Sequence, residues 1–151
     1  LMADIVSPEK RSQNMSAIRS KNTQPEVYLR KLLFAQGYRY RIADKSVPGH
    51  PDIFLRKYNT AIFVNGCFWH RHPGCKFAYT PKSRVEFWQK KFDDNVQRDA
   101  VVKAELLERG TKCLVVWECA IKRMVKDRQY EMDMVEKCKQ FLTSPDLLQE
   151  F

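Results

Sequence analysis

The segment 65–75 gathers the side chains of this sequence that are best suited to chemistry. It reads Asn-Gly-Cys-Phe-Trp-His-Arg-His-Pro-Gly-Cys, so Cys67 and Cys75 enclose His70 and His72. Thiolate and imidazole are the ligands that tetrahedral zinc prefers in structural sites. We therefore expect this segment to bind zinc, with a further ligand contributed from elsewhere in the chain.

Cys119 is the best candidate for that further ligand. It follows the apolar run 113–117, an expected strand that can pair beside the strand leading into Cys67. Cys113, inside that run, and Cys138, on an expected helix face, are predicted to lie in the core as small apolar side chains. Incidental cysteines without a metal are the alternative, because the spacing is not that of a standard zinc finger.

Zinc needs only one of the two histidines, which leaves the other for a different role. His72, three residues before Cys75, is the more natural ligand. His70 then stands on a metal-braced loop directly after a buried strand, and Asp99 of a later helix can orient it through its second ring nitrogen. The alternatives are a structural histidine and a solvated aspartate.

Asp52 opens a short strand expected at 52–55, beside the strand expected at 61–64. A carboxylate and a backbone carbonyl at adjacent strand ends offer the hard oxygen ligands that Mg²⁺ prefers alongside substrate phosphates. The alternative for this acid is simple exposure to solvent.

Phe68 and Trp69 are unusual as core residues, because they stand in a polar Cys/His segment of a basic protein. Bulky side chains in such a place are suited to wedging between stacked bases of DNA. Trp88, on an expected helix, is a third candidate wedge, with ordinary packing as the alternative.

Helices and strands expected from the hydrophobic periodicity must hold these residues in place. Thr23-Gln-Pro-Glu26 has the form of a capping box and opens a helix that Gly37 ends. The other expected elements are strands at 38–42, 52–55, 61–64 and 113–117 and helices at 84–109 and 127–142. This order predicts a single α/β domain at 23–151, with a mixed central sheet flanked by helices.

Composition narrows the class of protein further. The 151 residues carry 27 Lys and Arg against 18 Asp and Glu, and the net charge of +9 favours nucleic acid as a partner. With no secretory signal and no apolar run long enough for a membrane helix, we expect a cytoplasmic protein whose cysteines are thiols or metal ligands. The basic segment 1–22 is expected to be a flexible arm that orders on a phosphate backbone, with a frayed terminus as the alternative.

Several of these motifs occur together in a known family. Pro51-Asp52, Ala-Ile-Phe-Val-Asn-Gly-Cys-Phe-Trp-His-Arg-His at 61–72, Glu-Phe-Trp at 86–88, Asn-Val-Gln-Arg-Asp at 95–99 and Val-Trp-Glu-Cys at 116–119 resemble the very short patch repair (Vsr) DNA mismatch endonucleases. The resemblance implies a restriction-endonuclease-like core with a structural zinc loop. It also implies Mg²⁺-dependent phosphodiester hydrolysis that nicks duplex DNA 5′ to the thymine of a T:G mismatch, which arises when 5-methylcytosine deaminates.

The resemblance also implies roles for individual residues. Asp52 is the main Mg²⁺-binding carboxylate with the carbonyl of Val64 as a further ligand, His70 is the general base, Asp99 is its partner and Glu26 is a supporting acid. The structural zinc is held by Cys67, His72, Cys75 and Cys119. The residues that insert beside the mismatch are Phe68, Trp69 and Trp88, while the N-terminal arm embraces the DNA.

The sequence departs from the family pattern at two places and leaves other functions open. Asn65 stands where the family pattern has histidine, and Pro73-Gly74 lengthens the spacing between the zinc-loop cysteines. The alternatives to a mismatch nuclease are a zinc-stabilised DNA-binding module without catalysis and a restriction-type nuclease. We expect a monomer that acts on the nucleoid of a bacterium and contacts mismatch-repair proteins.

Overall fold

The structure, a computed structural model, describes residues 22–151, so the arm expected at 1–22 lies outside the described residues except for Asn22. In chain order they form α2 (Gln24–Ala35), β1 (Ile53–Leu55), the 3-10 helix η2 (Arg56–Tyr58), β2 (Thr60–Asn65), α3 (Val85–Glu108), β3 (Lys112–Trp117), α4 (Glu118–Lys126), α5 (Arg128–Thr143) and β4 (Leu148–Glu150). The strands form one sheet in the order β1-β2-β3-β4. β1 runs antiparallel to β2, whereas β3 runs parallel to β2 and β4 parallel to β3. The predicted mixed sheet is therefore confirmed.

The capping box predicted at the start of α2 is present. The Thr23 hydroxyl accepts a hydrogen bond from the Glu26 backbone N–H at 3.4 Å, and the Glu26 carboxylate accepts one from the Thr23 N–H at 3.1 Å. These bonds satisfy donors that the first turn of a helix leaves without partners. The start of α2 is thereby fixed by residues close together in the sequence.

β2 and β3 form the centre of the sheet and decide where the functional residues meet. They pair in parallel register from Thr60 opposite Lys112 to Asn65 opposite Trp117. All of β3 is buried, as its run of apolar residues predicts. Because parallel strands end at the same edge of a sheet, the loop that follows Asn65 and the helix that follows Trp117 start side by side.

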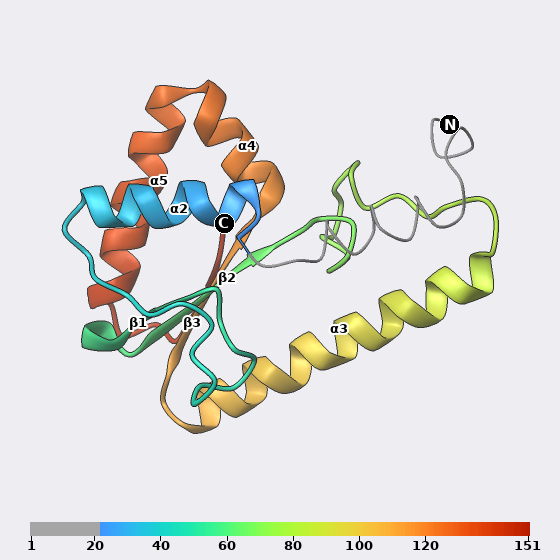
Figure 1. Cartoon of the computed structure of the whole chain (residues 1–151), viewed down its shortest axis with the longest axis horizontal. Helices are drawn as coiled ribbons and strands as arrows, with labels where there is room; N and C mark the ends of the chain where they lie inside the picture. The colour runs from blue at the N-terminus through green and yellow to red at the C-terminus, as the bar shows by residue number, and fades with distance from the viewer. Residues whose placement is uncertain (1–21) are drawn as a thin grey trace.

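Helices cover both faces of the sheet (Figure 1). On one face α2, α4 and α5 pack against alternate strand residues such as Ile62, Leu114 and Val116. On the other face the C-terminal half of α3 packs through Leu106 against Val115 and its neighbours. The two layers of apolar contacts enclose the sheet, which gives the strands a rigid position.

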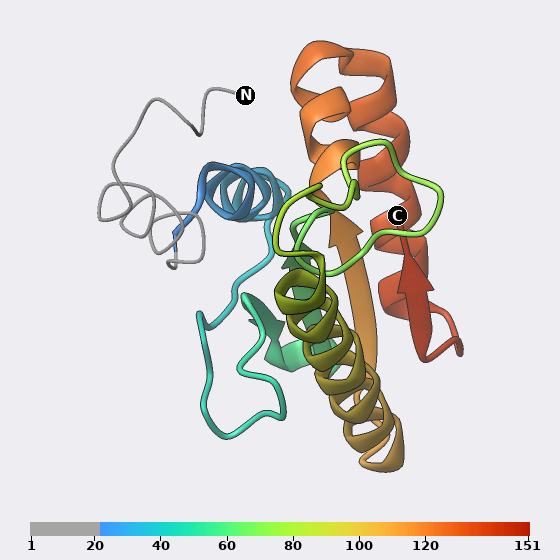
Figure 2. The same ribbon diagram turned by 90° about the vertical axis from the view of Figure 1, so that its right-hand side faces the viewer.

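The N-terminal half of α3 extends beyond the sheet (Figure 1). In the whole of α3 only Phe92 and Leu106 are buried. Figure 2 shows the loop that joins β2 to α3 arching over this end of the helix, close to α4.

None of the helices in the described part of the chain combines the length and apolarity needed to cross a membrane.

Residues 38–42 do not form the expected strand. A single antiparallel bridge, between Arg41 and Phe54, is the only ladder contact of this segment. Tyr38 and Tyr40 pack against the core as partly buried side chains, and Tyr38 meets Tyr58 edge to face at 5.6 Å between ring centroids. The alternating pattern therefore reflects a half-buried loop, because β1 is too short to offer a longer partner.

α4 and β4 are elements that the periodicity did not predict. α4 follows β3 directly, and its N-cap Trp117 makes no side-chain capping bond, so no local signal marks the start. β4 is three residues long with an alternating exposed pattern. It exists because β3 offers an open parallel edge, with Cys113 opposite Leu148.

Candidate active site and metal centre

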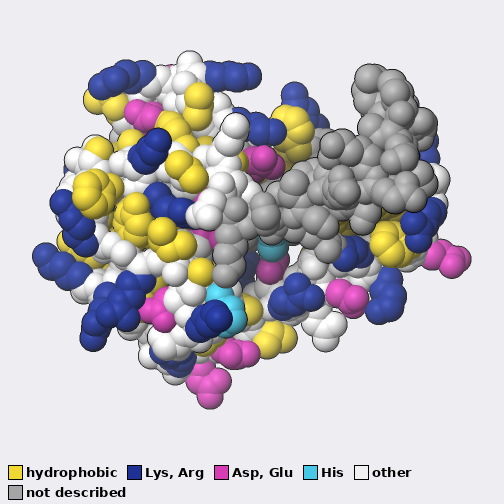
Figure 3. All heavy atoms as spheres, viewed as in Figure 1, with side chains coloured by type: hydrophobic (Ala, Val, Ile, Leu, Met, Phe, Trp, Pro, Cys, Tyr) yellow, Lys and Arg dark blue, Asp and Glu magenta, His cyan; other side chains and the backbone are white. Residues whose placement is uncertain are grey.

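A cleft of about 810 Å³ opens at the edge of the sheet where β2 and β3 end. Figure 3 shows this side hollowed between the α/β body and the projecting end of α3, with a histidine and an acidic side chain visible in the hollow. The predicted site residues that line the cleft are Glu26, Asp52, Val64, Phe68, Trp69, His70 and Asp99. The sheet edge, the loop after β2 and α3 thus bring together residues that lie far apart in the sequence.

Asp52 stands at the start of β1, next to the end of β2, as the sequence predicts. Its Oδ2 accepts a hydrogen bond from the Val64 backbone N–H at 2.7 Å. Burial raises the pKa of Asp52 to about 7, and the adjacent Glu26 carboxyl adds to the rise, while the Val64 N–H and the Arg30 guanidinium oppose it. A buried carboxyl next to a second carboxyl is an arrangement that a cation would stabilise in its charged form.

Glu26 takes part in both the helix cap and the cleft. It is 8% exposed, and its Oε2 accepts hydrogen bonds from the N–H groups of Asn22 and Thr23 at 2.7 and 3.1 Å. The Arg30 guanidinium lies 3.3 Å from the same oxygen. The capping bonds therefore explain why an acid stands here, and its contact with Asp52 places a second carboxyl in the cleft.

His70 and Asp99 form a direct pair across the cleft wall. The His70 Nδ1 lies 2.6 Å from Asp99 Oδ2, with 32% and 28% of the two side chains exposed. The His70 backbone N–H donates to the Gly66 carbonyl at 3.0 Å, which closes a turn directly after β2. Because Nδ1 is engaged by Asp99, the Nε2 atom is the ring nitrogen that remains for a substrate. The structure therefore brings this predicted pair together.

The four expected zinc ligands also come together, three of them from the loop after β2 and Cys119 from α4. The ligand atoms of Cys67, His72, Cys75 and Cys119 all lie within 4.8 Å of one another. The His72 Nδ1 is 3.4 Å from the Cys119 sulfur, and the Cys119 N–H donates to the Cys67 sulfur at 3.4 Å. This cluster could hold a metal ion, and three thiols with one imidazole match the chemistry of a tetrahedral zinc site.

The pKa of Cys67 shows what the thiols of the cluster need in order to ionise. Burial raises the pKa of the Cys67 thiol to about 12, and the nearby Cys119 and Cys75 thiols add to this rise. A cation among the sulfurs favours the thiolate form and offsets both effects. Cys113 and Cys138, which were predicted to be core residues, are 0% and 8% exposed and lie in the two packed layers.

Trp117 stacks on the imidazole of the Cys/His cluster, and Glu150 holds the Trp117 indole in place. The rings of His72 and Trp117 are stacked, with centroids 4.2 Å apart and planes 8° from parallel. The Trp117 indole N–H donates to Glu150 Oε1 at 3.0 Å, and Lys103 donates to the other oxygen at 3.3 Å. β4 is therefore linked to the Cys/His cluster through one aromatic ring, a contact that no sequence motif predicts.

The three predicted wedge residues form one aromatic cluster. Phe68 is at its centre, with ring centroids 5.0 Å from Trp69 and 5.7 Å from Trp88. Phe92, 2% exposed, lies 5.2 Å from Phe68 and anchors the cluster to α3. Tyr79 lies 5.1 Å from Phe68 and is 56% exposed, so the aromatic surface continues out to solvent.

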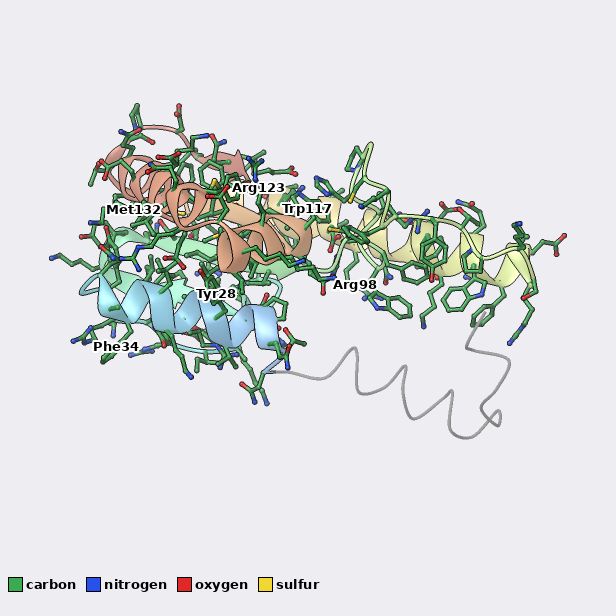
Figure 4. The ribbon with its side chains drawn as sticks, turned by 90° about the horizontal axis from the view of Figure 1, so that it is seen from above. Tyr28, Phe34, Arg98, Trp117, Arg123 and Met132 are labelled. Carbon is green, nitrogen blue, oxygen red and sulfur yellow. The ribbon has the colours of Figure 1, made fainter. Side chains whose placement is uncertain are left out.

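Sequence reasoning missed several ionisable residues that also line the cleft. They are His50, Lys91, Arg98, Lys103, Glu118 and Lys122. Arg98 leaves α3 on the side that faces the start of α2, as Figure 4 shows. The signal was present for two of them, because Arg98 precedes Asp99 and Glu118 precedes Cys119 within motifs already noted. The cleft therefore presents cations around its acidic residues, which suits a phosphate-bearing substrate.

Comparison with known proteins gives consistent matches. The family model described as DNA mismatch endonuclease Vsr matches residues 3–76. A protein of Neisseria meningitidis named type II nicking enzyme V.NmeAIP is 45% identical over 138 residues, which are 91% of this chain and 98% of that protein. The DNA mismatch endonuclease Vsr of Escherichia coli is 43% identical over 121 residues, 80% of this chain and 77% of that protein. The type II nicking enzyme V.XorIIP of Xanthomonas oryzae is 44% identical over 120 residues, 80% of this chain and 88% of that protein. The similarity extends over most of the chain and is not confined to one motif.

Proposed function

Because this chain belongs to the Vsr family of DNA mismatch endonucleases, we propose that it nicks duplex DNA 5′ to the thymine of a T:G mismatch. Such mismatches arise from deamination of 5-methylcytosine, and the nick would start their repair. The observation that carries the proposal is the pair of His70 and Asp99 in one cleft with Asp52. That arrangement offers, within one cleft, a base for a water molecule and oxygen ligands for a cation.

His70 is the proposed general base. Its Nδ1 is held by Asp99 at 2.6 Å, which fixes the ring orientation and stabilises the imidazolium that forms when Nε2 takes a proton from the attacking water. Imidazole exchanges protons near neutral pH, so the pair can both accept and release this proton in each cycle. Asp99 in this scheme orients His70 and does not itself contact DNA.

Asp52 and the carbonyl oxygen of Val64 are the proposed ligands of a catalytic Mg²⁺, with Glu26 as a supporting acid. The N–H and C=O groups of one strand residue point to the same side, so the Val64 carbonyl faces the edge at which its N–H meets Asp52. The raised pKa of Asp52, caused by burial and by Glu26, supports a site that is completed by a cation. A divalent cation bound there supplies positive charge that stabilises the negative charge developing on the phosphate oxygens.

The proposed role of zinc is structural. Cys67, His72 and Cys75 flank His70 and the aromatic pair on one loop, and Cys119 ties that loop to the start of α4. This loop has no periodic apolar face that could hold it in place. Zinc would therefore fix the loop on which both the base and the aromatic residues stand.

The aromatic cluster is proposed to read the mismatch. Phe68, Trp69 and Trp88 would insert between base pairs beside the T:G step, and opening a step that already stacks poorly costs less than opening a matched one. Selectivity would then come from the deformability of the DNA. The net charge of +9 supplies general attraction to phosphates. We propose that the arm at 1–22 is an additional clamp on the DNA.

The setting proposed for this activity follows from its substrate. A monomer suffices to nick one strand. Because the proposed substrate is chromosomal DNA, the protein would act in the cytoplasm of a bacterium. Mismatch-repair proteins are the proposed partners, because a nick needs further enzymes to be completed as repair.

The test is strand cleavage of a labelled duplex with one T:G mismatch, beside its T:A control, with Mg²⁺ and with EDTA. The flanking sequence is varied in a small library, since relatives are named both as a DNA mismatch endonuclease and as type II nicking enzymes. Mg²⁺-dependent nicking of the thymine strand alone is expected. Equal cutting of both duplexes would indicate a restriction-type nuclease, and tight binding without any nicking would indicate a non-catalytic DNA-binding module.

Two variants connect this result to the residues. His70→Ala and Asp52→Ala are expected to abolish nicking while they preserve the fold and the metal content of the Cys/His cluster. Asp94→Asn, at an exposed pair with Lys90 on α3, is the control for changes in charge. Nicking at the unmodified rate by either alanine variant would remove that residue from the mechanism.

A further inference from the structure

We propose that Arg71 is the positioning residue that holds the aromatic wedge in the shape needed to read a mismatch. Arg71 stands between His70 and His72, and neither the motif nor the metal site gives it a role. The inference rests on the proposed function of Phe68 and Trp69 as wedges. It concerns the residue through which those rings are held in place.

The Arg71 guanidinium joins the two limbs of the loop. Its Nη1 donates to the Phe68 carbonyl at 3.1 Å and to the Tyr79 carbonyl at 3.0 Å. Its Nη2 donates to the Ala78 carbonyl at 2.8 Å and to the Thr80 hydroxyl at 3.3 Å. One side chain thus fastens the limb that carries the wedge to the limb that returns to α3, the loop seen over the helix end in Figure 2.

The same group also fixes the loop to the helix. The guanidinium carbon lies 3.8 Å from the ring centroid of Phe92, the buried anchor of the aromatic cluster, and 5.7 Å from that of Phe68. A planar cation on an aromatic face is a favourable contact, and it is stronger where water is excluded.

The loop holds the backbone of Arg71 in an unfavourable conformation. Its φ is +54°, a left-handed conformation that costs energy for a residue other than glycine. The Nη donors point at protein carbonyls and a hydroxyl, so they are already used when DNA arrives. Arg71 therefore acts on the loop and is not one of the free cations that attract the phosphate backbone.

The consequence for the wedge is that its rings are ordered before binding. A loop that must order itself when its rings insert loses conformational entropy at that step. The loss falls on the mismatched duplex, into which the rings insert, and so reduces discrimination between a weak and a normal base step. Lysine carries the same charge but has one ammonium group, which cannot stack flat on Phe92 and reach carbonyls on both limbs. Arg71→Lys therefore keeps the charge and removes the fastening.

The experiment compares nicking of T:G and T:A duplexes by Arg71→Lys and the unmodified protein. We expect the ratio of the two rates to fall by about tenfold, the scale of one charge-assisted hydrogen bond, with cleavage of the T:A duplex unchanged. The matched control is Arg84→Lys. Arg84 also lies over an aromatic ring, 4.3 Å from the centroid of Phe87, yet its side chain donates no hydrogen bond to any residue in 22–151.

A double-mutant cycle of Arg71→Lys with Trp69→Ala separates a role of Arg71 in positioning the wedge from general support of the fold. If Arg71 acts through the wedge, Arg71→Lys has little further effect on selectivity once Trp69 is absent, so the two changes are not additive. Additive losses, or loss of metal from Arg71→Lys, would assign Arg71 to the stability of the metal loop and overturn the proposal. An unchanged T:G to T:A ratio in Arg71→Lys would overturn it as well.

Hydrogen–deuterium exchange of the free protein gives a result that does not depend on activity. Faster exchange across 66–81 in Arg71→Lys, with exchange in β3 unchanged, is expected, and equal exchange would contradict the fastening. If the unmodified protein does not distinguish T:G from T:A, the proposed function itself is wrong. If the unmodified protein discriminates and Arg71→Lys does so equally well, only the proposed role of Arg71 is wrong.

Discussion

The indole ring of Trp117 lies flat on the imidazole ring of His72, with 4.2 Å between centroids and 8° between planes. This contact links the end of the central strand β3 to the Cys/His cluster. It also links the cluster to β4, because Trp117 donates to Glu150 at 3.0 Å. The last strand of the chain thus supports a member of the Cys/His cluster that stands about half the chain length earlier.

Removal of the Glu150 carboxylate is expected to weaken metal retention. Glu150→Ala leaves the Trp117 N–H and Lys103 without their acceptor, so the ring behind His72 can shift. We expect faster transfer of zinc to a chromogenic chelator and a loss of about 1 kcal/mol in the free energy of unfolding, the scale of a net hydrogen bond. Glu105→Ala, at an exposed position of α3, is the control, and equal release rates in the two variants would contradict the link.

Cys119 is expected to be required for the metal at the Cys/His cluster. Cys119→Ser replaces a soft ligand and should lower both the bound zinc and the melting temperature. Cys138→Ala, in the packed layer of α5, should lower stability through a small cavity but retain the metal. Metal analysis together with thermal melting separates the two effects, and full zinc content in Cys119→Ser would refute its assignment as a ligand.

Asp99 is expected to act on the reaction through His70. Asp99→Asn keeps the size of the side chain but removes the charge that stabilises an imidazolium 2.6 Å away. We expect nicking of the T:G duplex to slow by about a hundredfold, within the range of general base catalysis, with DNA affinity little changed. Asp94→Asn on the same helix is the control. A rate within twofold of the unmodified protein would show that His70 needs no such partner.

Glu26 has an observed role in the helix cap and a proposed role in the cleft, and mutation can separate the two. Thr23→Ala removes one of the capping bonds and should cost about 1 kcal/mol of stability in a urea melt. Glu26→Gln retains an oxygen that can accept from the first turn but removes the negative charge beside Asp52, so it should slow nicking while stability falls less. If Glu26→Gln nicks normally, Glu26 serves the helix cap alone.

The features that the sequence determined are those whose causes are local. The capping box of Thr23 and Glu26 places the start of α2 within four residues of chain, and the apolar runs identify β2 and β3. The types of residue between Cys67 and Cys75 likewise specify soft metal ligands whatever the fold around them. The order of elements then identified the mixed sheet on which the site is built.

The expected strand at 38–42 shows where local reasoning ends. Its alternating pattern is real, but a strand exists only where another strand offers backbone partners, and the segment finds one bridge at Phe54. The short β4 is the converse case, because its weak pattern becomes a strand on the open edge of β3. Pairing is a property of two segments, so neither pattern contained the outcome.

The sequence by itself determined which groups are available for chemistry: the thiols and imidazole of the metal loop, His70, and the acids Asp52 and Asp99. Only the tertiary structure decided their relationships. The parallel pairing of β2 with β3 places Cys119 against Cys67, and packing of α2 on the sheet places Glu26 beside Asp52. It also decided that Arg71 turns inward and that Trp117 supports His72. The physical reason is that hydrogen bonds, stacking and pKa shifts depend on distances of a few ångströms between residues that the chain itself keeps far apart.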